Sequence, residues 1–243
     1  MSLDRPALKA RVRQMMGIVR PHPCWIAIAS LVVSHVLVYL ASDVTGQLAL
    51  QQQLLTAQTE QQIQMVMENY LYHLRPWGLL LGLALMIMNH IWSCGFTIYC
   101  LRATRGHQVN LACLMDGFSL FFRLLWLHIL MGIFVYLWSL LLIIPGIIAS
   151  YRYRQAIYIL LEHPEMRPME CIRQSSALMR GHKWELFVLD LSLIGWYVLS
   201  LIPLVTIWVL PYTEFIRAEY YNQLTGWPPA TEDGKPGADP FGY

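Results

Sequence analysis

The stretch LLWLHILMGIFVYLWSLLLIIPGIIASYRYRQAIYILLE, residues 124–162, decides the fold. Its apolar run is long enough for a helix to cross a lipid bilayer. The stretch is either one membrane span with a long tail or two spans that fold back at Pro145–Gly146. The same choice arises at residues 186–222, where Pro203 interrupts another long apolar run.

The positions of the cationic residues favour two hairpins. Cytoplasmic loops of membrane proteins are enriched in Lys and Arg. If each long run crosses once, the basic segment 150–184 lies outside. If each run is a hairpin, thirteen of the seventeen Lys and Arg residues lie on the cytoplasmic side. Arg152, Arg154 and Arg217 then lie within the membrane, and only Arg75 lies outside.

The sequence therefore predicts an all-α polytopic membrane protein with about six transmembrane helices, including two tight helical hairpins. The expected spans are 24–44, 77–101, 122–144, 146–162, 186–202 and 205–222. The composition agrees, because 56% of the 243 residues are apolar and only 13% are charged, about half the charged share of a soluble domain. A disordered chain is excluded for the same reason. A helix of seventeen residues extends about 26 Å, slightly less than a hydrocarbon core of ~30 Å, so re-entrant hairpins stay an alternative.

Residues 1–23 are expected to form a cytoplasmic interfacial amphipathic helix. Its apolar stripe consists of Leu8, Val12, Met15, Met16 and Val19. The basic residues Lys9, Arg11, Arg13 and Arg20 are expected to bind the surface of an anionic membrane. The basic region is long for a signal peptide, so we expect the apolar run after it to be retained as the first span.

Residues 24–224 are predicted to form a single transmembrane helical domain. Within it, residues 45–76 form an extracytoplasmic, glutamine-rich helical loop, which is either a solvated connector or a receptor-like surface. Residues 225–243 contain several prolines and glycines and are expected to form a flexible cytoplasmic tail.

Three strings in the C-terminal half carry a family resemblance. They are IIPGIIASYRYRQAIYILLEHPE (143–165), CIRQSSALMRGHKWELFVLDLSLIGW (171–196) and PYTEFIRAEYYNQL (211–224). Residues 100–224 resemble a family of small integral membrane proteins of unknown function, widespread in Gram-positive bacteria. They are more distantly similar to the membrane domain of glycerophosphodiester phosphodiesterases. The resemblance implies an all-helical fold in a bacterial plasma membrane, and it implies no activity.

Six charged residues inside the predicted spans are the main candidate site, and we call them the charged seam. They are Arg152, Arg154, Asp190, Glu214, Arg217 and Glu219. A charge in a membrane helix costs roughly 2.5–3.5 kcal/mol on insertion scales, so we expect salt bridges between Glu214 and Arg217 and between Arg154 or Arg152 and Asp190 or Glu214. Two interpretations stay open, a path for an ion or substrate and a structural network of ion pairs.

Other polar residues carry weaker signals. His90, beside Asn89, is either a proton relay or ligand or a packed polar side chain, and His128 is similar. The five cysteines form no CxxC pair, so no metal ligand and no cofactor is predicted. The sequence contains no HExxH, GxSxG, Walker-type or GxGxxG motif, which argues against an enzyme.

The predicted function is that of a non-enzymatic membrane protein with a transport, export or accessory role, acting through the charged seam. The alternative is a membrane-embedded scaffold that holds a partner through a cytosolic helix at 169–181 and the glutamine-rich loop. The expected partners are the lipid bilayer and either a membrane or cytosolic protein or a second copy of the chain, without nucleic acid. Both termini are expected on the cytoplasmic side.

Overall fold

The computed structural model describes residues 4–72 and 76–227, and this part of the chain is helical without strands. The predicted flexible tail lies largely outside the described residues, as does Arg75. The helices are α1 (Arg5–Ile18), α2 (Pro23–Val44), α3 (Gln47–Thr56), α4 (Glu60–Tyr72), α5 (Pro76–Thr104), the 3-10 turn η1 (Leu111–Leu114), α6 (Asp116–Ser119), α7 (Phe121–Leu141), α8 (Ile143–Tyr153), α9 (Ala156–Glu162), α10 (Pro168–Leu178), α11 (Lys183–Leu191), α12 (Ile194–Leu199) and α13 (Pro203–Thr225).

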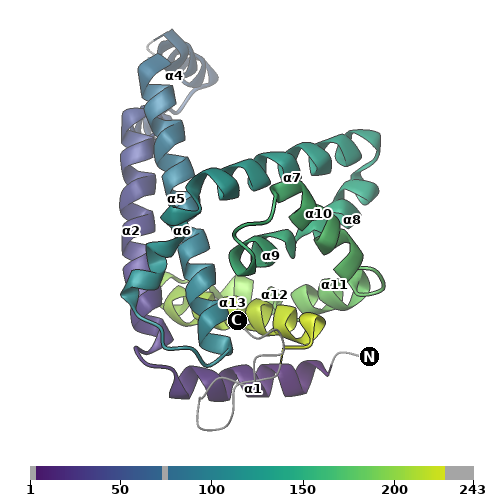
Figure 1. The fold of residues 1–243 in the computed structure, drawn as a ribbon. Helices are drawn as coiled ribbons and strands as arrows, with labels where there is room; N and C mark the ends of the chain where they lie inside the picture. Colours follow the sequence, from purple (N-terminus) through teal and green to yellow (C-terminus); the bar gives the residue numbers. More distant parts are fainter. Residues whose placement is uncertain (1–3, 73–75, 228–243) are drawn as a thin grey trace.

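Three of these helices, α2, α5 and α7, are long and apolar enough to cross a membrane by length and composition. Figure 1 shows α2 and α5 side by side, with α7 beginning next to α5 and leading away from it. Helices α2 and α5 are antiparallel, and a hydrogen bond from Trp92 Nε1 to the carbonyl of Ser30, at 3.3 Å, joins them. A bond from the Tyr99 hydroxyl to the carbonyl of Pro21, at 3.0 Å, joins the C-terminal part of α5 to the residues just before α2. The predicted all-helical fold is confirmed for the described residues. Six membrane spans are not confirmed, because three of the described helices are long and apolar enough to cross a membrane.

Of the three other predicted spans, two divide into shorter helices and one is a single long helix. Residues 146–162 divide into α8 and α9 at Arg154–Gln155, and residues 186–202 divide into α11 and α12 at Ser192–Leu193. Neither break contains proline or glycine, so the sequence had no local signal for them. The last predicted span is one helix, α13, with Pro211 inside it.

Helix α8 turns back along α7 after a single extended residue, Leu142. Gly146 lies so close to Ser139 that a Cβ at residue 146 would overlap the serine side chain. Such close backbone approach through small residues is typical of helix pairs in membranes. The sequence predicts the fold at Pro145–Gly146, but the chain turns at Leu142 and both residues lie inside α8, so the predicted membrane hairpins are not confirmed.

Residues 111–119 pack against the middle of α5. A Cβ at Gly95 would overlap the carbonyl of Leu114, and a Cβ at Gly117 would lie 2.8 Å from the carbonyl oxygen of Ile91. Only glycine permits this contact between a helix and a neighbouring backbone. Because of it, α7 begins beside the middle of α5 rather than at its end (Figure 1).

The glutamine-rich loop forms two helices, α3 and α4, rather than one. They lie at the end of the α2–α5 pair opposite to α1 (Figure 1). Neither helix has a buried residue.

Helix α1 packs on the protein with the apolar stripe that the sequence analysis identified. Asp4 caps it by accepting a hydrogen bond from the amide of Ala7, at 3.2 Å. Leu8, Val12, Met15 and Met16 are buried in the core, and α13 is the main neighbour of α1. The stripe therefore contacts protein in this structure.

Candidate functional site

The charged seam contains two ion pairs in the structure. Arg154, at the end of α8, pairs with Asp190 of α11. Arg217 pairs with Glu214 one turn earlier on α13, with Nη1 and Oε1 2.5 Å apart, and its Nη2 donates a hydrogen bond to the Tyr197 hydroxyl at 2.7 Å. Both pairs are among those expected from the sequence, because an unpaired charge in an apolar run is costly.

The other two seam residues lie elsewhere. Arg152 lies with its guanidinium 5.9 Å from the centre of the Tyr153 ring. Its backbone carbonyl accepts a 2.8 Å bond from the Ser175 hydroxyl, which ties α10 to α8. Glu219 is 1% exposed and pairs at 3.0 Å with Arg11 of α1. The six residues therefore do not form one continuous row.

A pocket of about 260 Å³ lies beside the two seam pairs, and we call it the seam pocket. It is bounded by α5, α7, α9, α11 and α13 together with the α8–α9 junction. Its ionisable and thiol side chains are His90, Cys94, His128, Arg154, Glu214, Arg217 and the phenols of Tyr158 and Tyr220. The side chain of Gln155 also lines it and is buried, with Oε1 lacking a hydrogen-bond partner in the described part of the chain.

Three potential metal ligands meet at one side of the seam pocket. His90 and Cys94 lie one turn apart on α5, and His128 comes from α7. One ligand atom from each lies within 4.8 Å of the other two. The two imidazole rings meet edge to face, with their centres 4.1 Å apart. The sequence predicts no metal ligand and leaves His90 and His128 as either ligands or packed polar side chains; the structure brings the two histidines together. The spacing of His90 and Cys94 was visible in the sequence, but the approach of His128 depends on the position of α7 beside α5.

A second polar cluster, which the sequence analysis did not identify, joins the ends of α5, α9 and α13. Arg105 Nη1 pairs with Glu162 Oε1 at 3.0 Å, and both side chains are more than nine-tenths buried. Arg105 Nε donates to Asn222 Oδ1 at 3.0 Å, and its guanidinium lies 3.9 Å from the centre of the Trp227 ring. The Asn222 amide in turn donates to Glu219, which links this cluster to α1.

The four basic residues predicted to bind a membrane surface have different surroundings. Lys9 donates to the carbonyl of Ser192 at 3.3 Å, and its pKa is lowered by partial burial and by the neighbouring cations Arg13 and Arg5. Arg11 pairs with Glu219, whereas Arg13 and Arg20 are exposed. Arg13 and Arg20 are therefore accessible, whereas Lys9 and Arg11 contact other parts of the protein.

The predicted cytosolic helix at 169–181 corresponds to α10 and the turn after it. Ser175 and Ser176 are buried there, because α10 packs on α7, α8 and α9. Burial raises the pKa of the Cys171 thiol on the same face to about 11. The exposed residues of α10 are Met169, Glu170, Arg173, Gln174 and Ala177.

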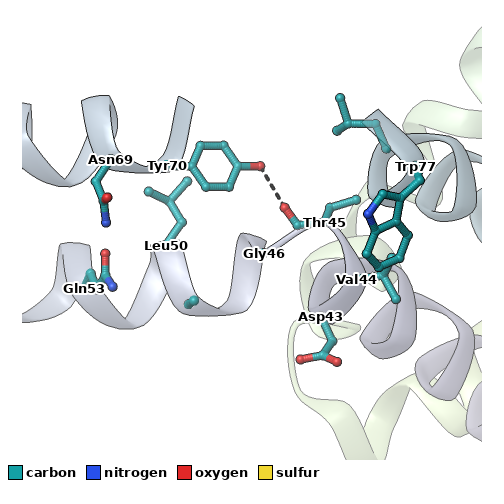
Figure 2. Close-up of a pocket in the computed structure, with 11 residues that line it drawn as sticks. Asp43, Val44, Thr45, Gly46, Leu50, Gln53, Asn69, Tyr70 and Trp77 are labelled. Atoms are coloured by element: carbon teal, nitrogen blue, oxygen red, sulfur yellow. Dashed lines mark hydrogen bonds between the residues drawn. The ribbon is translucent and has the colours of Figure 1, made fainter. Parts of the chain in front are cut away.

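A further pocket, of about 450 Å³, lies where α3 and α4 join the α2–α5 pair. Figure 2 shows the amide groups of Gln53 and Asn69 facing each other there, with Tyr70 beside them. The Tyr70 hydroxyl donates to the carbonyl of Thr45 at 3.3 Å, which fastens α4 to the end of α2 (Figure 2).

A comparison with known proteins finds a family similarity for part of the chain. The family model described as "Protein of unknown function (DUF975)" matches residues 139–227, which is less than half of the chain. No curated protein and no solved structure matches. The matched range contains both ion pairs of the charged seam, whereas His90, Cys94 and His128 precede it. The C-terminal part of this chain, from the end of α7 to Trp227, is thus similar to a family of unknown function.

Proposed function

We propose that this chain is a non-enzymatic membrane protein that moves a small charged solute, or assists a partner that does, through the charged seam. The observation that carries the proposal is that Arg154, Glu214 and Arg217 line the same pocket. Their side chains are 31%, 17% and 26% exposed, so the two ion pairs are not sealed inside the protein. Ionisable groups that face a cavity among membrane helices are typical of ion and substrate pathways.

Polar atoms without a hydrogen-bond partner, close to the two ion pairs of the seam, also support a polar solute or water in this region. Asp190 Oδ1, Arg217 Nε and Gln155 Oε1 are buried and have no hydrogen-bond partner among the described residues. A buried polar atom without a partner is costly, and water or a polar solute in the seam offsets that cost. A purely structural pair network would be expected to use these atoms internally.

The proposed topology has six membrane crossings and two hairpins, with both termini on the cytoplasmic side of a bacterial plasma membrane. Two contacts between distant segments support it. Arg105, just after α5, pairs with Glu162 at the end of α9, and Arg11 of α1 pairs with Glu219 of α13. The two partners of each pair must lie on the same side of the membrane, as they do if residues 122–162 and 186–222 each leave and return. The resemblances to Gram-positive proteins and to the phosphodiesterase membrane domain stay predictions.

Aqueous access to the seam pocket tests the proposed route. Ser93 and Thr97 are small and line the pocket, so each is replaced by Cys in turn. We expect both thiols to react with a charged methanethiosulfonate reagent in intact membranes at least about tenfold faster than a thiol at Val32. Val32 is 58% exposed on the apolar helix α2 and is expected to face lipid, where a thiol reacts poorly with a charged reagent. Equal, slow rates at all three positions would show a sealed seam and would favour structural ion pairs.

The scaffold is the second candidate, and the exposure of α3 and α4 favours it. These glutamine-rich helices bury no residue, and the pocket at their base offers amide groups to a partner (Figure 2). The exposed side of α10 within 169–181 is the other proposed contact. A scaffold predicts that replacing Gln53 by Ala removes a co-purifying protein while membrane insertion stays normal. Retention of the same partner would count against this use of the pocket.

A further inference from the structure

We propose that His90, Cys94 and His128 bind a Zn²⁺ ion between α5 and α7. This inference does not depend on the proposed transport, because a metal ion at this position can be structural. It concerns residues that line the seam pocket but do not belong to the two ion pairs, and these residues lie outside the family match.

The separation of the three ligand atoms suits a tetrahedral metal site. Zn–N bonds of about 2.0–2.1 Å and Zn–S bonds of about 2.3 Å place neighbouring ligand atoms about 3.3–3.6 Å apart. The atoms of His90, Cys94 and His128 already lie within 4.8 Å of one another. Metal binding therefore requires these atoms to move closer together by at most about 1.5 Å, a shift within the reach of side-chain rotation. The positions of His90 and Cys94, four residues apart on α5, direct both side chains toward the same side.

The backbone sets the tautomer of His128 that a metal requires. Its Nδ1 lies 2.8 Å from the carbonyl oxygen of Leu124. A carbonyl only accepts, so Nδ1 carries the proton of the neutral ring, and Nε2 keeps a free lone pair for a metal. Hydrogen bonding of the second ring nitrogen is typical of histidines that ligate metals. His35 makes the same bond to Leu31, at 2.9 Å, but lies outside the cluster, and it therefore serves as a matched control.

The surroundings of the cluster offer room for a fourth ligand. The cluster borders the seam pocket, where the buried Gln155 has an Oε1 atom without a hydrogen-bond partner in the described ranges, and where Glu214 also lies. Three protein ligands and one open position are a common arrangement for accessible Zn²⁺ sites. Water in the open position can donate a hydrogen bond to Gln155 or Glu214.

The chemical types of the three ligand atoms favour one class of metal ion. Two imidazole nitrogens and one thiolate suit Zn²⁺ and neighbouring late transition metals, whereas Mg²⁺ and Ca²⁺ prefer oxygen ligands. When the ion binds, the thiol of Cys94 forms the Zn–S bond and loses its proton to water. The bound ion thus satisfies three polar groups on otherwise apolar helices.

Zn²⁺ binding to the full chain in detergent micelles tests the proposal. Isothermal titration is expected to give one Zn²⁺ per chain, with affinity reduced at least about 100-fold in Cys94→Ser and His128→Ala, since even loss of an outer partner of a ligand costs about 10–100-fold. His35→Ala and Cys24→Ser are expected to bind as the wild type does. Wild-type affinity in Cys94→Ser, or the absence of stoichiometric binding to the wild type, would overturn the proposal.

X-ray absorption on the Zn²⁺-loaded wild type is a second measurement that does not require a variant to fold. We expect one sulfur neighbour at about 2.3 Å and at least two nitrogen neighbours at about 2.0–2.1 Å. A shell without sulfur would contradict the site. Slow labelling in the seam pocket combined with normal Zn²⁺ binding would refute the transport route and leave the metal site intact.

Discussion

Replacement of Glu162 by Gln tests the buried cluster that holds α5, α9 and α13 together. Glutamine keeps the size of the side chain but removes its charge. It leaves the Arg105 guanidinium, 8% exposed, without the carboxylate that now lies 3.0 Å away. The Tyr221 hydroxyl, which donates to Glu162 Oε2 at 2.5 Å, can still donate to the amide oxygen. The substitution therefore isolates the loss of charge.

The expected loss of stability is about 3–4 kcal/mol. Two unit charges 3.0 Å apart attract by about 5.5 kcal/mol at an effective dielectric constant near 20, before the cost of desolvation. Measured losses on removing one partner of a buried pair are about 3–5 kcal/mol, because the remaining charge stays buried. Arg105 retains its bond to Asn222 and its contact with the Trp227 ring, which places the estimate in the lower part of this range.

Equilibrium unfolding in mixed micelles, followed by far-ultraviolet circular dichroism, measures the free energy of unfolding. Glu165→Gln is the matched control, because Glu165 is 73% exposed and its loss is expected to cost under about 1 kcal/mol. The double variant Arg105→Met with Glu162→Gln is expected to be less destabilised than the sum of the two single variants, by at least about 2 kcal/mol. A Glu162→Gln protein within about 1 kcal/mol of the control would refute this account of the cluster.

Three further predictions concern packing and reactivity. Gly95→Ala is expected to destabilise the protein by about 1–3 kcal/mol in the same unfolding assay, because its Cβ overlaps the carbonyl of Leu114. Gly17→Ala, where a Cβ meets no atom within 4 Å, is expected to be neutral or slightly stabilising, and equal effects at both glycines would contradict the close contact. Glu219→Gln removes the partner of Arg11 and is expected to weaken the packing of α1, so that proteolysis within residues 5–18 becomes faster. An unchanged cleavage rate would show that this ion pair does not hold α1 in place. The Cys171 thiol, buried and with its pKa raised to about 11, is expected to resist alkylation at pH 8 until the protein unfolds; rapid labelling of the folded protein would contradict this.

Charge pairing within the seam could be predicted from the sequence because the physical constraint is local and strong. Arg154 and Asp190 both interrupt apolar runs, and each needs a partner there. The partner of Glu219 could not be predicted in the same way. Arg11 lies on an amphipathic helix, and an apolar stripe fits the surface of a protein as well as the surface of a membrane.

The cluster of His90, Cys94 and His128 depends on how α5 and α7 pack together, which residue spacing in the sequence does not predict. It forms because Gly95 and Gly117 let residues 111–119 approach α5, which places the start of α7 beside its middle. The two glycines can be read from the sequence, but their contact with each other's segment, α5 with residues 111–119, cannot be predicted from it. The buried pairing of Arg105 with Glu162 was missed for a related reason, since both residues lie at the ends of predicted spans, where charges are expected to face water.

Side-specific labelling of two single cysteines tests the central claim, that residues 122–162 leave the cytoplasmic side and return to it. Gln58, between α3 and α4, and Glu165, between α9 and α10, are both exposed, and the five native cysteines are all buried. With a membrane-impermeant maleimide, we predict that Gln58→Cys is labelled in intact cells and that Glu165→Cys is labelled only after the membrane is permeabilised. Labelling of Glu165→Cys in intact cells, to the same extent as Gln58→Cys, would contradict the hairpin and with it the proposed topology.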